Sequence, residues 1–270
     1  MPHHAPGPRA GWLCDTGRVL QVFGPESEWP RQDLIAFSEE FDASLALAAY
    51  QSGVFPMPLL DGDHATDMGW WSPMARGVLP LQHLRVTRSL RKTARRYTTT
   101  LDLAFDEVMT RCAEPGRPGG WITDEIKDVC RQFHQHDLAH SVEVWDQDGR
   151  LVGGLYGVSI GGLFCGESMF HDHQHGRDAS KVALTRLVGE MADHASPQWQ
   201  SAHRLLDVQW LTPHLESLGA IEIARRDYLD RLDTLLRTPP PRFKVGEAGR
   251  HRGLGAPPPH QEGADHAGDA

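Results

Sequence analysis

The chain has 270 residues, a length that accommodates one large domain or two small ones, and we expect two. Its 27 Lys and Arg residues are outnumbered by 36 Asp and Glu residues, and the formal net charge of −9 argues against a generally basic nucleic-acid-binding protein, although a local basic patch remains compatible with it. The four cysteines form no C-x-x-C pair, no apolar run reaches the roughly 18 residues of a membrane span, and the first residues lack a signal-peptide pattern, so we expect a cytoplasmic protein with reduced thiols.

The chain begins with a Pro-, His- and Gly-rich stretch over residues 1–11 that is typical of disorder. A small, irregular α+β unit is predicted over residues 12–101. Its features are a short helix, a proline-studded segment, a Trp-Trp-Ser-Pro motif and a short strand, at residues 44–52, 54–59, 70–73 and 76–80. At the other end, proline runs and scattered His, Gly and Asp residues predict disorder over residues 238–270.

Residues 102–237 form a second unit with more regular elements. The predicted helices occupy residues 103–112, 124–137, 180–194 and 227–236. The predicted strands occupy residues 141–145, 151–159, 163–170, 205–210 and 221–223, and turn sequences between the first three indicate an antiparallel meander. This order is that of the N-acetyltransferase-like (GNAT) fold. We therefore predict an α+β protein in which a small N-terminal unit precedes a GNAT-like C-terminal domain with a mixed sheet, a fold that names no substrate by itself.

Three polar side chains interrupt apolar strands of the second unit. Glu167 lies within the strand predicted at 163–170, and Asp207 and Gln209 lie on one face of the strand predicted at 205–210. An unpaired carboxylate or amide inside such a strand costs several kcal/mol. We therefore expect these three groups to meet one another, a ligand, or both.

An ordered series of short motifs runs from about Leu34 to Leu236. The motifs are Ala48-Ala-Tyr-Gln-Ser-Gly-Val-Phe-Pro56, Trp70-Trp-Ser-Pro73, Gly120-Trp-Ile-Thr123, His140-Ser-Val-Glu-Val-Trp145, Leu151-Val-Gly-Gly-Leu-Tyr-Gly157, Phe164-Cys-Gly-Glu-Ser-Met-Phe170, Ala179-Ser-Lys181, Asp207-Val-Gln209, Ser217-Leu-Gly-Ala220 and Arg225-Arg-Asp-Tyr-Leu229. This series resembles the leucyl/phenylalanyl-tRNA–protein transferase family. The resemblance implies a monomeric bacterial enzyme that moves Leu, Phe or Met from its tRNA to the α-amino group of an N-terminal Lys or Arg of a protein, which marks that protein for degradation.

The resemblance assigns catalytic roles to Asp207, Gln209 and Glu167. An aminoacyl ester is already activated, so the reaction needs positioning rather than a metal or cofactor, and we expect none. The Gln209 carbonyl can accept a hydrogen bond from the attacking amine, Asp207 can orient the Gln209 amide, and Glu167 can bind a cationic amine or a Lys or Arg side chain. The alternatives are a satisfied polar pair at a sheet end for Asp207 and Gln209, and a buried salt bridge from Glu167 to Arg225 or Arg226.

Four apolar residues are candidates for a pocket that admits a Leu, Phe or Met side chain: Leu155, Phe164, Met169 and Leu184. Strand alternation places Phe164 and Met169 on opposite faces, so the two can line one pocket only if the strand twists or contains a bulge. Plain core packing is the alternative for Phe164 and Leu184.

Two features are expected to hold the tRNA. Trp121 resembles the family tryptophan that packs near the terminal adenosine, with an ordinary core tryptophan as the alternative, and Met57 occupies the position of a second family tryptophan. A basic run recurs at helical spacing, so its charges share one stripe; the resemblance assigns it to acceptor-stem phosphates, and a solvated helix face is the alternative. The run consists of Arg88, Arg91, Lys92, Arg95 and Arg96.

Two further segments differ from the family pattern. Ser38-Glu-Glu40 replaces a Gly-Gly pair, and the loop His171-Asp-His-Gln-His-Gly176 is longer; we expect its histidines to be surface residues rather than a metal site. Two alternative functions follow from the fold and the charge pattern. An acyl-CoA-dependent N-acyltransferase is disfavoured because Gly176-Arg-Asp-Ala-Ser180 supplies one glycine where a pyrophosphate loop needs several, and a non-catalytic tRNA-binding adaptor remains open.

Overall fold

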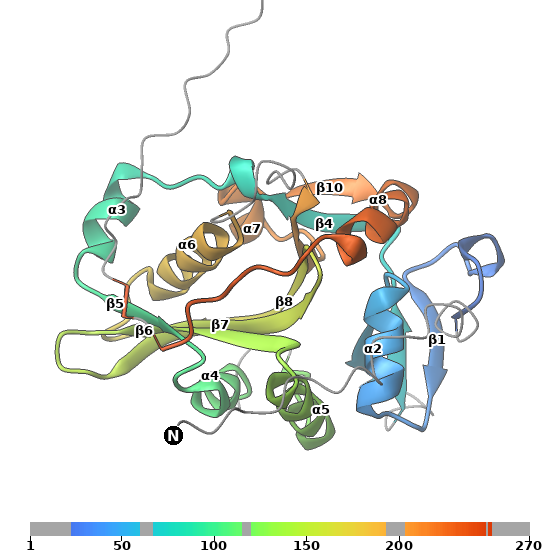
Figure 1. The fold of residues 1–270 in the computed structure, drawn as a ribbon, viewed down its shortest axis with the longest axis horizontal. Coiled ribbons are helices and arrows are strands. Elements are labelled where there is room, and N and C mark those ends of the chain that lie inside the picture. Colours follow the sequence, from blue (N-terminus) through green and yellow to red (C-terminus); the bar gives the residue numbers. More distant parts are fainter. Residues whose placement is uncertain (1–22, 60–66, 115–119, 193–202, 247, 250–270) are drawn as a thin grey trace, which may run out of the picture.

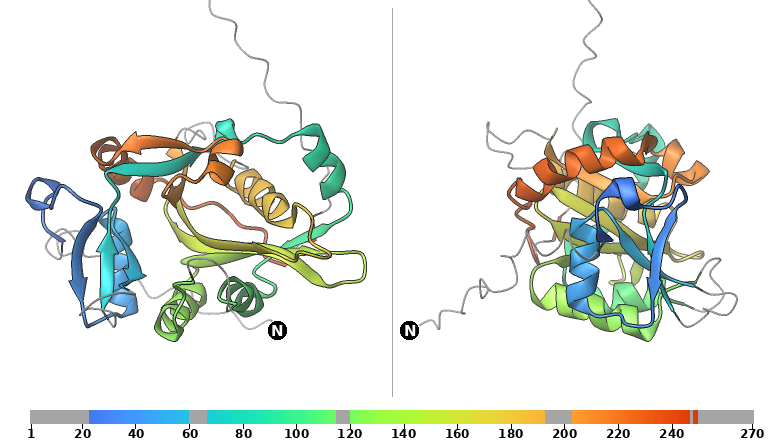
Figure 2. Two further views of the ribbon diagram at one scale, coloured as in Figure 1. Left: turned by 180° about the vertical axis from the view of Figure 1, so that it is seen from behind. Right: turned by 90° about the vertical axis from the view of Figure 1, so that its right-hand side faces the viewer.

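The computed structural model describes residues 23–59, 67–114, 120–192, 203–246 and 248–249. Two sheets organise this part of the chain. A three-stranded antiparallel sheet has the order β1 (Leu34–Ser38), β3 (Met68–Trp71), β2 (Phe55–Pro58), and α2 (Ala43–Gln51) packs against it. A larger sheet has seven strands, and the small unit lies beside one end of it (Figures 1 and 2).

The seven-stranded sheet is mixed. Its order is β10 (Ile221–Ala224), β4 (Ala75–Pro80), β9 (Leu205–Gln209), β8 (Leu163–His171), β7 (Leu151–Ile160), β6 (Ala139–Trp145) and β5 (Thr98–Leu101). Strands β8 and β9 pair in parallel, and the other neighbours pair antiparallel. The predicted fold class, an α+β protein with a small N-terminal unit and a larger domain built on a mixed sheet, is confirmed.

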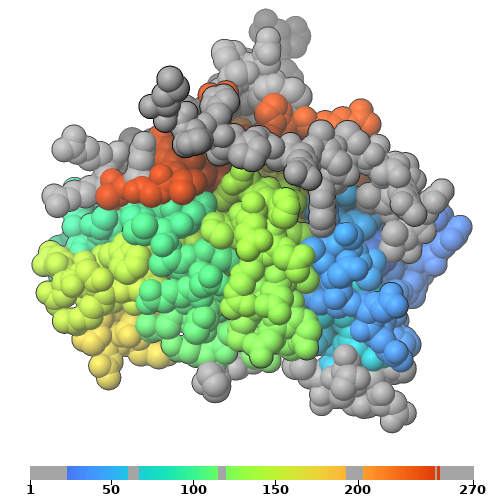
Figure 3. Space-filling model, turned by 60° about the horizontal axis from the view of Figure 1, so that its bottom comes forward, coloured from blue at the N-terminus to red at the C-terminus, as the bar shows by residue number. Residues whose placement is uncertain are grey.

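Helices cover both faces of the large sheet and divide the core in two. On one face lie α4 (Phe105–Cys112) and α5 (Asp124–Gln135), and Figure 3 shows them beside the α2 helix of the small unit. On the other face lies α6 (Ala179–Ala192), flanked by α3 (Arg88–Ala94). We call the two apolar clusters the α5 side, which also includes residues of α2 and α8 (Arg225–Arg237), and the α6 side.

Local sequence signals explain where several helices begin. The side chains of Asp42, Thr87, Thr123 and Thr212 each accept a hydrogen bond from a backbone N–H three residues on, at the start of α2, α3, α5 and α7 (Pro213–Ser217). The amphipathic face predicted for α5 is confirmed, because its four apolar residues at helical spacing are all buried.

Two expected boundaries differ from the observed arrangement. The first unit was expected to extend to residue 101, but β4 and β5 pair in the seven-stranded sheet, so the small sheet ends at Trp71. Disorder was expected from residue 238, but residues 238–246 cross the same sheet face as α6 (Figure 1). There the Phe243 ring lies 4.3 Å from that of His140, and Gly249 bridges to Thr99. Apolar contact at a single Phe orders a segment whose average composition is polar. Residues 1–11, 247 and 250–270 lie outside the described residues.

A bulge in β8 sets the direction of the side chains that follow it. Gly157 of β7 lies opposite Gly166, and Tyr156 lies opposite Ser168, so Glu167 is the extra residue of β8. A Cβ atom on Gly157 would collide with the carbonyl oxygen of Cys165, which explains why glycine occupies this close approach.

Candidate active site

The candidate site lies where β8 and β9 separate. Their parallel pairing ends at Cys165 and Asp207, and each strand then continues without the other. Glu167 and Gln209 each stand two residues beyond this last pair. The three polar residues predicted from the sequence therefore lie at the last pair of these two strands or just beyond it.

Asp207 is fully buried and its carboxylate accepts hydrogen bonds from three sides. Arg76 donates through Nε to Oδ1 at 2.9 Å and through Nη2 to Oδ2 at 2.5 Å. The Tyr228 hydroxyl donates to Oδ2 at 2.9 Å, and the backbone N–H of Gln209 donates to Oδ1 at 2.9 Å. With these lone pairs occupied, the carboxylate is suited to hold its neighbours in place.

Arg76 is the permanent partner of this carboxylate. Its side chain is 1% exposed and lies between the rings of Phe55 and Tyr228, with Cζ 4.9 Å and 4.4 Å from the two ring centroids. Burial is the largest single influence and would lower the pKa of the Arg76 guanidinium, but the charge of Asp207, the charge of Tyr228 and the hydrogen bonds to Asp207 together outweigh it and leave that pKa above its usual value. Burial, followed by the charge of Asp207, also raises the pKa of Tyr228.

Gln209 is held in an unusual backbone conformation. Its φ is +60°, a left-handed value that few residues other than glycine adopt, and the Asp207 carboxylate supports it through the backbone N–H. We expected Asp207 to orient the Gln209 side-chain amide, but the hydrogen bond goes to the backbone instead. The Gln209 Nε2 atom is buried and has no hydrogen-bond partner in the described part of the chain.

Glu167 occupies the bulge of β8 and is half-buried. The Tyr50 hydroxyl of α2 donates to its Oε1 at 2.9 Å, so a residue of the small unit contacts a strand of the large sheet. Burial raises the pKa of Glu167 to about 8; the Tyr50 hydrogen bond opposes this rise and the charge of Asp207 adds to it. The alternative salt bridge to Arg225 is not formed, since Arg225 donates to the carbonyls of Pro30, Gln32 and Ser72.

The same bulge brings the predicted apolar residues together. Beyond it, Met169 lies opposite Leu155 in the register, and both belong to the α6-side cluster that contains Phe164 and Leu184. Without the extra residue, Met169 and Phe164 would face opposite ways. Met169 is half-buried, whereas Phe164 and Leu184 are buried completely, so they also fit the alternative of plain core residues.

Comparison with known proteins identifies the family. The family model for leucyl/phenylalanyl-tRNA protein transferase matches residues 78–233, and the model for the N-terminal domain of that family matches residues 39–74. The chain belongs to the leucyl/phenylalanyl-tRNA–protein transferase family. The first matched segment ends just before β4 and the second begins within β4, close to where the chain passes from the small sheet to the large one.

Curated relatives carry the same name. A leucyl/phenylalanyl-tRNA–protein transferase of Rhizorhabdus wittichii is 47% identical over 199 residues, which is 72% of this chain and 75% of the relative. Those of Salmonella typhimurium and Salmonella typhi are 43% identical over 208 residues, 76% of this chain and 82% of the relatives. The predicted enzyme class, an aminoacyltransferase, is thereby confirmed. No helix in the described residues is long and apolar enough to cross a membrane.

The residues that resemble the adenosine-binding positions of the family lie on the α5 side. Trp121 precedes α5 and Met57 lies on β2, and both are half-buried against the cluster that contains Tyr50 and Cys165. The Met57 backbone carbonyl accepts a hydrogen bond from Trp71 Nε1 at 2.9 Å. Cluster packing of this kind fits both a base-stacking wall and the alternative of a structural tryptophan.

The basic run extends beyond a helix that is shorter than expected. α3 ends at Ala94, so Arg95 and Arg96 follow the helix and only part of the predicted stripe is helical. Four of the five cationic side chains are exposed and Arg91 is half-buried. None of the five forms an ion pair with an acid within the described ranges, so their charge is available to a polyanion.

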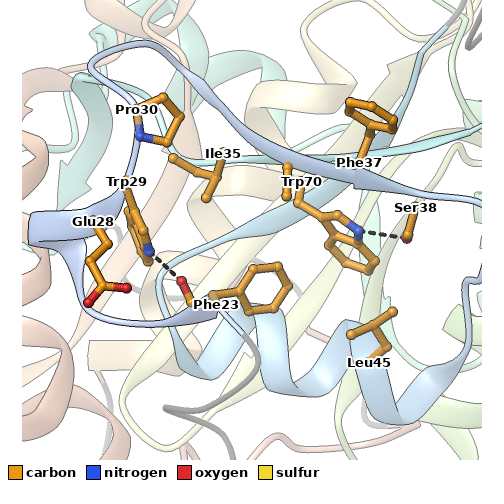
Figure 4. A pocket seen from close by; sticks show the side chains of 10 residues that line it. Phe23, Glu28, Trp29, Pro30, Ile35, Phe37, Ser38, Leu45 and Trp70 are labelled. Carbon is orange, nitrogen blue, oxygen red and sulfur yellow. Dashed lines mark hydrogen bonds between the residues drawn. The ribbon is translucent and has the colours of Figure 1, made fainter.

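One pocket adjoins a candidate site residue, and another lies apart from the site in the small unit. One, of about 410 Å³, lies at the start of α6 and is lined by Met169, His171, Asp178, Ser180, Lys181 and His214. The other, of about 360 Å³, lies in the small unit between Phe23, Trp29, Ile35 and Trp70, away from the residues described above (Figure 4). Among the described residues, no group of three His, Cys, Asp or Glu side chains is arranged to hold a metal ion.

Three contributors to this site were missed by sequence reasoning: Tyr50, Arg76 and Tyr228. Each lies in or beside a motif that carries the family resemblance or opens a predicted strand. A buried arginine at the start of an apolar strand is a detectable signal, because such a charge needs an acid partner. The two tyrosines gave no comparable signal, since a buried tyrosine is ordinary in a core.

Proposed function

We propose that this protein transfers Leu, Phe or Met from aminoacyl-tRNA to the α-amino group of an N-terminal Lys or Arg of an acceptor protein, and so tags that protein for degradation. The observation that carries the proposal is the end of the β8–β9 pairing, where Gln209, whose side-chain Nε2 has no partner among the described residues, and Glu167, whose carboxyl has a raised pKa, each follow the last strand pair by two residues. Family membership supports the donor class, an aminoacyl ester of tRNA.

The reaction needs one new bond and one broken bond. The acceptor nitrogen attacks the ester carbonyl carbon, a C–N bond forms, and the C–O bond to the terminal ribose breaks. The ribose oxygen leaves with the electron pair and takes a proton, while the nitrogen loses one. The Gln209 side-chain oxygen supports this step by accepting a hydrogen bond from the attacking amine, and the Arg76–Asp207 pair keeps the Gln209 backbone in place.

Glu167 is matched to the acceptor in charge and in proton affinity. An α-amino group has a pKa of roughly 7.7 to 8.0, close to the value of about 8 to which burial raises the pKa of Glu167. A proton can therefore move from the acceptor ammonium to the carboxylate at little cost, leaving a neutral nucleophile. The same carboxylate attracts a cationic acceptor during binding.

The decisive experiment supplies purified protein with radiolabelled Leu-tRNA and peptides that begin with Arg, Lys or Ala. Transfer to the Arg and Lys peptides, with little to the Ala peptide, is the expected result. Absence of transfer to all three would refute the proposal. Label transferred from acetyl-CoA instead would establish the N-acyltransferase alternative.

Gln209→Asn tests the role of the amide. Asparagine tolerates the left-handed backbone but is one methylene shorter, so the carbonyl retreats from the amine and kcat should fall by roughly 100-fold. Asp137→Asn is a matched control, because Asp137 has a similar left-handed φ of +57°, is exposed, and is distant from Gln209 in the sequence. Unchanged transfer in Gln209→Asn would refute the role of the amide, whereas tRNA binding by a wild-type protein that transfers no leucine would favour the non-catalytic adaptor.

A further inference from the structure

The pocket at the start of α6 adjoins the candidate acyl pocket. Met169 belongs to both, since it lines this space and packs against the apolar cluster beneath α6. The remaining lining is polar: His171 from β8, Asp178, Ser180 and Lys181 from the start of α6, and His214 from α7. A molecule whose apolar end lies among the cluster residues can place its polar end here.

The first turn of α6 presents unused hydrogen-bond donors to this pocket. Ser180 is 6% exposed and lines the pocket, and its hydroxyl has no hydrogen-bond partner in the part of the chain that the structure describes. The N–H groups of Ala179 and Val182 bond back to the carbonyls of Gly176 and Asp178. Those of Ser180 and Lys181 have no acceptor among the described residues, as first-turn groups often do not. A serine that lines a pocket without a hydrogen-bond partner, beside free N–H groups, is typical of a ligand site.

The charges around these donors are nearly balanced. Lys181 Nζ lies 2.8 Å from Asp178 Oδ1, and both side chains are partly exposed. Burial lowers the pKa of His214 below its usual value, and the charges of Lys181 and His171 lower it further. The lysine is therefore the cationic group closest to the free donors, and Asp178 competes with any anion for it.

We propose that this pocket binds the phosphate that joins the last two nucleotides of the donor tRNA, with Ser180 and Lys181 as the contacts. The inference deepens the proposed function and rests on it. One phosphate matches the Ser180 hydroxyl, the two free N–H groups and the Lys181 ammonium. The loop before α6 contains one glycine, Gly176, and offers too few N–H groups for a pyrophosphate.

A tRNA rather than an acceptor peptide is the favoured occupant. An acceptor with an N-terminal Lys or Arg is cationic there and carries no anion to use these donors. In addition, α6 packs against α3, the helix that carries part of the exposed basic run. The Tyr97 hydroxyl, which follows α3 in the chain, donates to the carbonyls of His175 and Arg177 in the loop before α6, at 3.2 and 3.0 Å. The pocket and the basic run therefore adjoin one helix pair, as contacts along one nucleic-acid strand would.

The test compares small donors that differ only in a phosphate. Leucyl-adenosine and leucyl-adenosine 5′-phosphate are supplied to the full-length protein with an Arg peptide, and binding of adenosine and 5′-AMP is measured by calorimetry. The phosphate should lower KM and the AMP dissociation constant by about tenfold, with little change in kcat. Equal values for the two members of each pair would overturn the proposal.

Variants then locate the phosphate contact. Lys181→Ala and Ser180→Ala should lose most of the tenfold advantage yet keep the activity with leucyl-adenosine, and Asp178→Asn should enlarge the advantage by removing the competing carboxylate. Arg88→Ala is the matched control, since it removes an exposed charge of the basic run and should leave the phosphate advantage unchanged. An advantage that survives Lys181→Ala and Ser180→Ala would place the phosphate elsewhere and refute the site.

The binding measurement separates this proposal from the proposed function. A protein that does not transfer leucine from Leu-tRNA, yet binds 5′-AMP more tightly than adenosine through Lys181, would refute the function and keep the phosphate site. A protein that transfers leucine but binds 5′-AMP no more tightly than adenosine would keep the proposed function and refute the phosphate site. Melting temperatures of all variants identify any that fail to fold.

Discussion

Replacing Tyr50 by Phe should shift the pH dependence of transfer, because Tyr50 donates a hydrogen bond to Glu167 at 2.9 Å. That bond lowers the pKa of Glu167 against the larger opposing effect of burial, which leaves the pKa at about 8. A hydrogen bond to a charged group contributes roughly 1.5 kcal/mol, and about 1.4 kcal/mol corresponds to one pH unit. If the reaction needs ionised Glu167, the midpoint of the rising limb of kcat/KM should move from about 8 to about 9, and kcat/KM near pH 7 should fall roughly tenfold.

The assay measures initial rates of leucine transfer to an Arg peptide between about pH 6 and about pH 10, with rates of ester hydrolysis subtracted. The acceptor amine titrates in the same window, but it is identical for both proteins and cancels in their comparison. Tyr50 is 4% exposed and packs against Phe133 with ring centroids 6.3 Å apart, a contact that Phe retains, so the fold should persist. Coincident midpoints for the two proteins would refute the coupling of Tyr50 to Glu167, and a profile unchanged in Glu167→Gln would refute the role of Glu167 itself.

Three other outcomes are expected. Arg76→Met should lower the free energy of unfolding by about 3 to 5 kcal/mol in chemical denaturation, since it leaves Asp207 buried without its counter-charge, and Asp207→Leu in the same chain should restore part of the loss. Lys92→Glu should weaken tRNA binding and reduce the slope of log K against log salt by about 1, without changing the melting temperature; an unchanged slope would mean that Lys92 lies off the tRNA path. Gly157→Ala should abolish transfer by displacing the bulge of β8. Gly189→Ala is its control: Gly189 lies in a helix, a Cβ there meets nothing within 4 Å, and the substitution should raise the free energy of unfolding by roughly 1 kcal/mol and leave transfer intact.

Local signals in the sequence predicted much of the fold. The apolar spacing of α5 and the strand order of the meander depend on residues close together in the chain, so their periods can be read directly. The bulge at Glu167 depends instead on the register between β7 and β8, which the close approach of Gly157 to β8 decides. Sequence reasoning could state that a twist or a bulge was required to bring Phe164 and Met169 together, but nothing local to β8 showed which of the two occurs or where.

Contacts between distant segments account for the remaining differences. The Arg76–Asp207 pair joins residues 131 positions apart, and the Tyr50–Glu167 hydrogen bond joins residues 117 positions apart. Composition did not anticipate the placement of residues 238–246, because Phe243 finds aromatic partners in His140 and Phe164 that an averaged composition does not contain. In each case the deciding partner is set by tertiary structure rather than by sequence neighbours.

The two acids at the split between β8 and β9 have different environments, and the difference separates their roles. Asp207 is fully buried, faces the Arg76 guanidinium and accepts hydrogen bonds from Tyr228 and the Gln209 backbone, so its oxygens are already engaged by neighbouring groups. Glu167 is half-buried and accepts a hydrogen bond from Tyr50, and burial raises its pKa to about 8, so it can exchange a proton near neutral pH. A carboxyl whose pKa is raised toward neutral pH is suited to carry a proton. Under the proposed function we therefore assign proton transfer to Glu167 and the holding of the Gln209 backbone to Asp207.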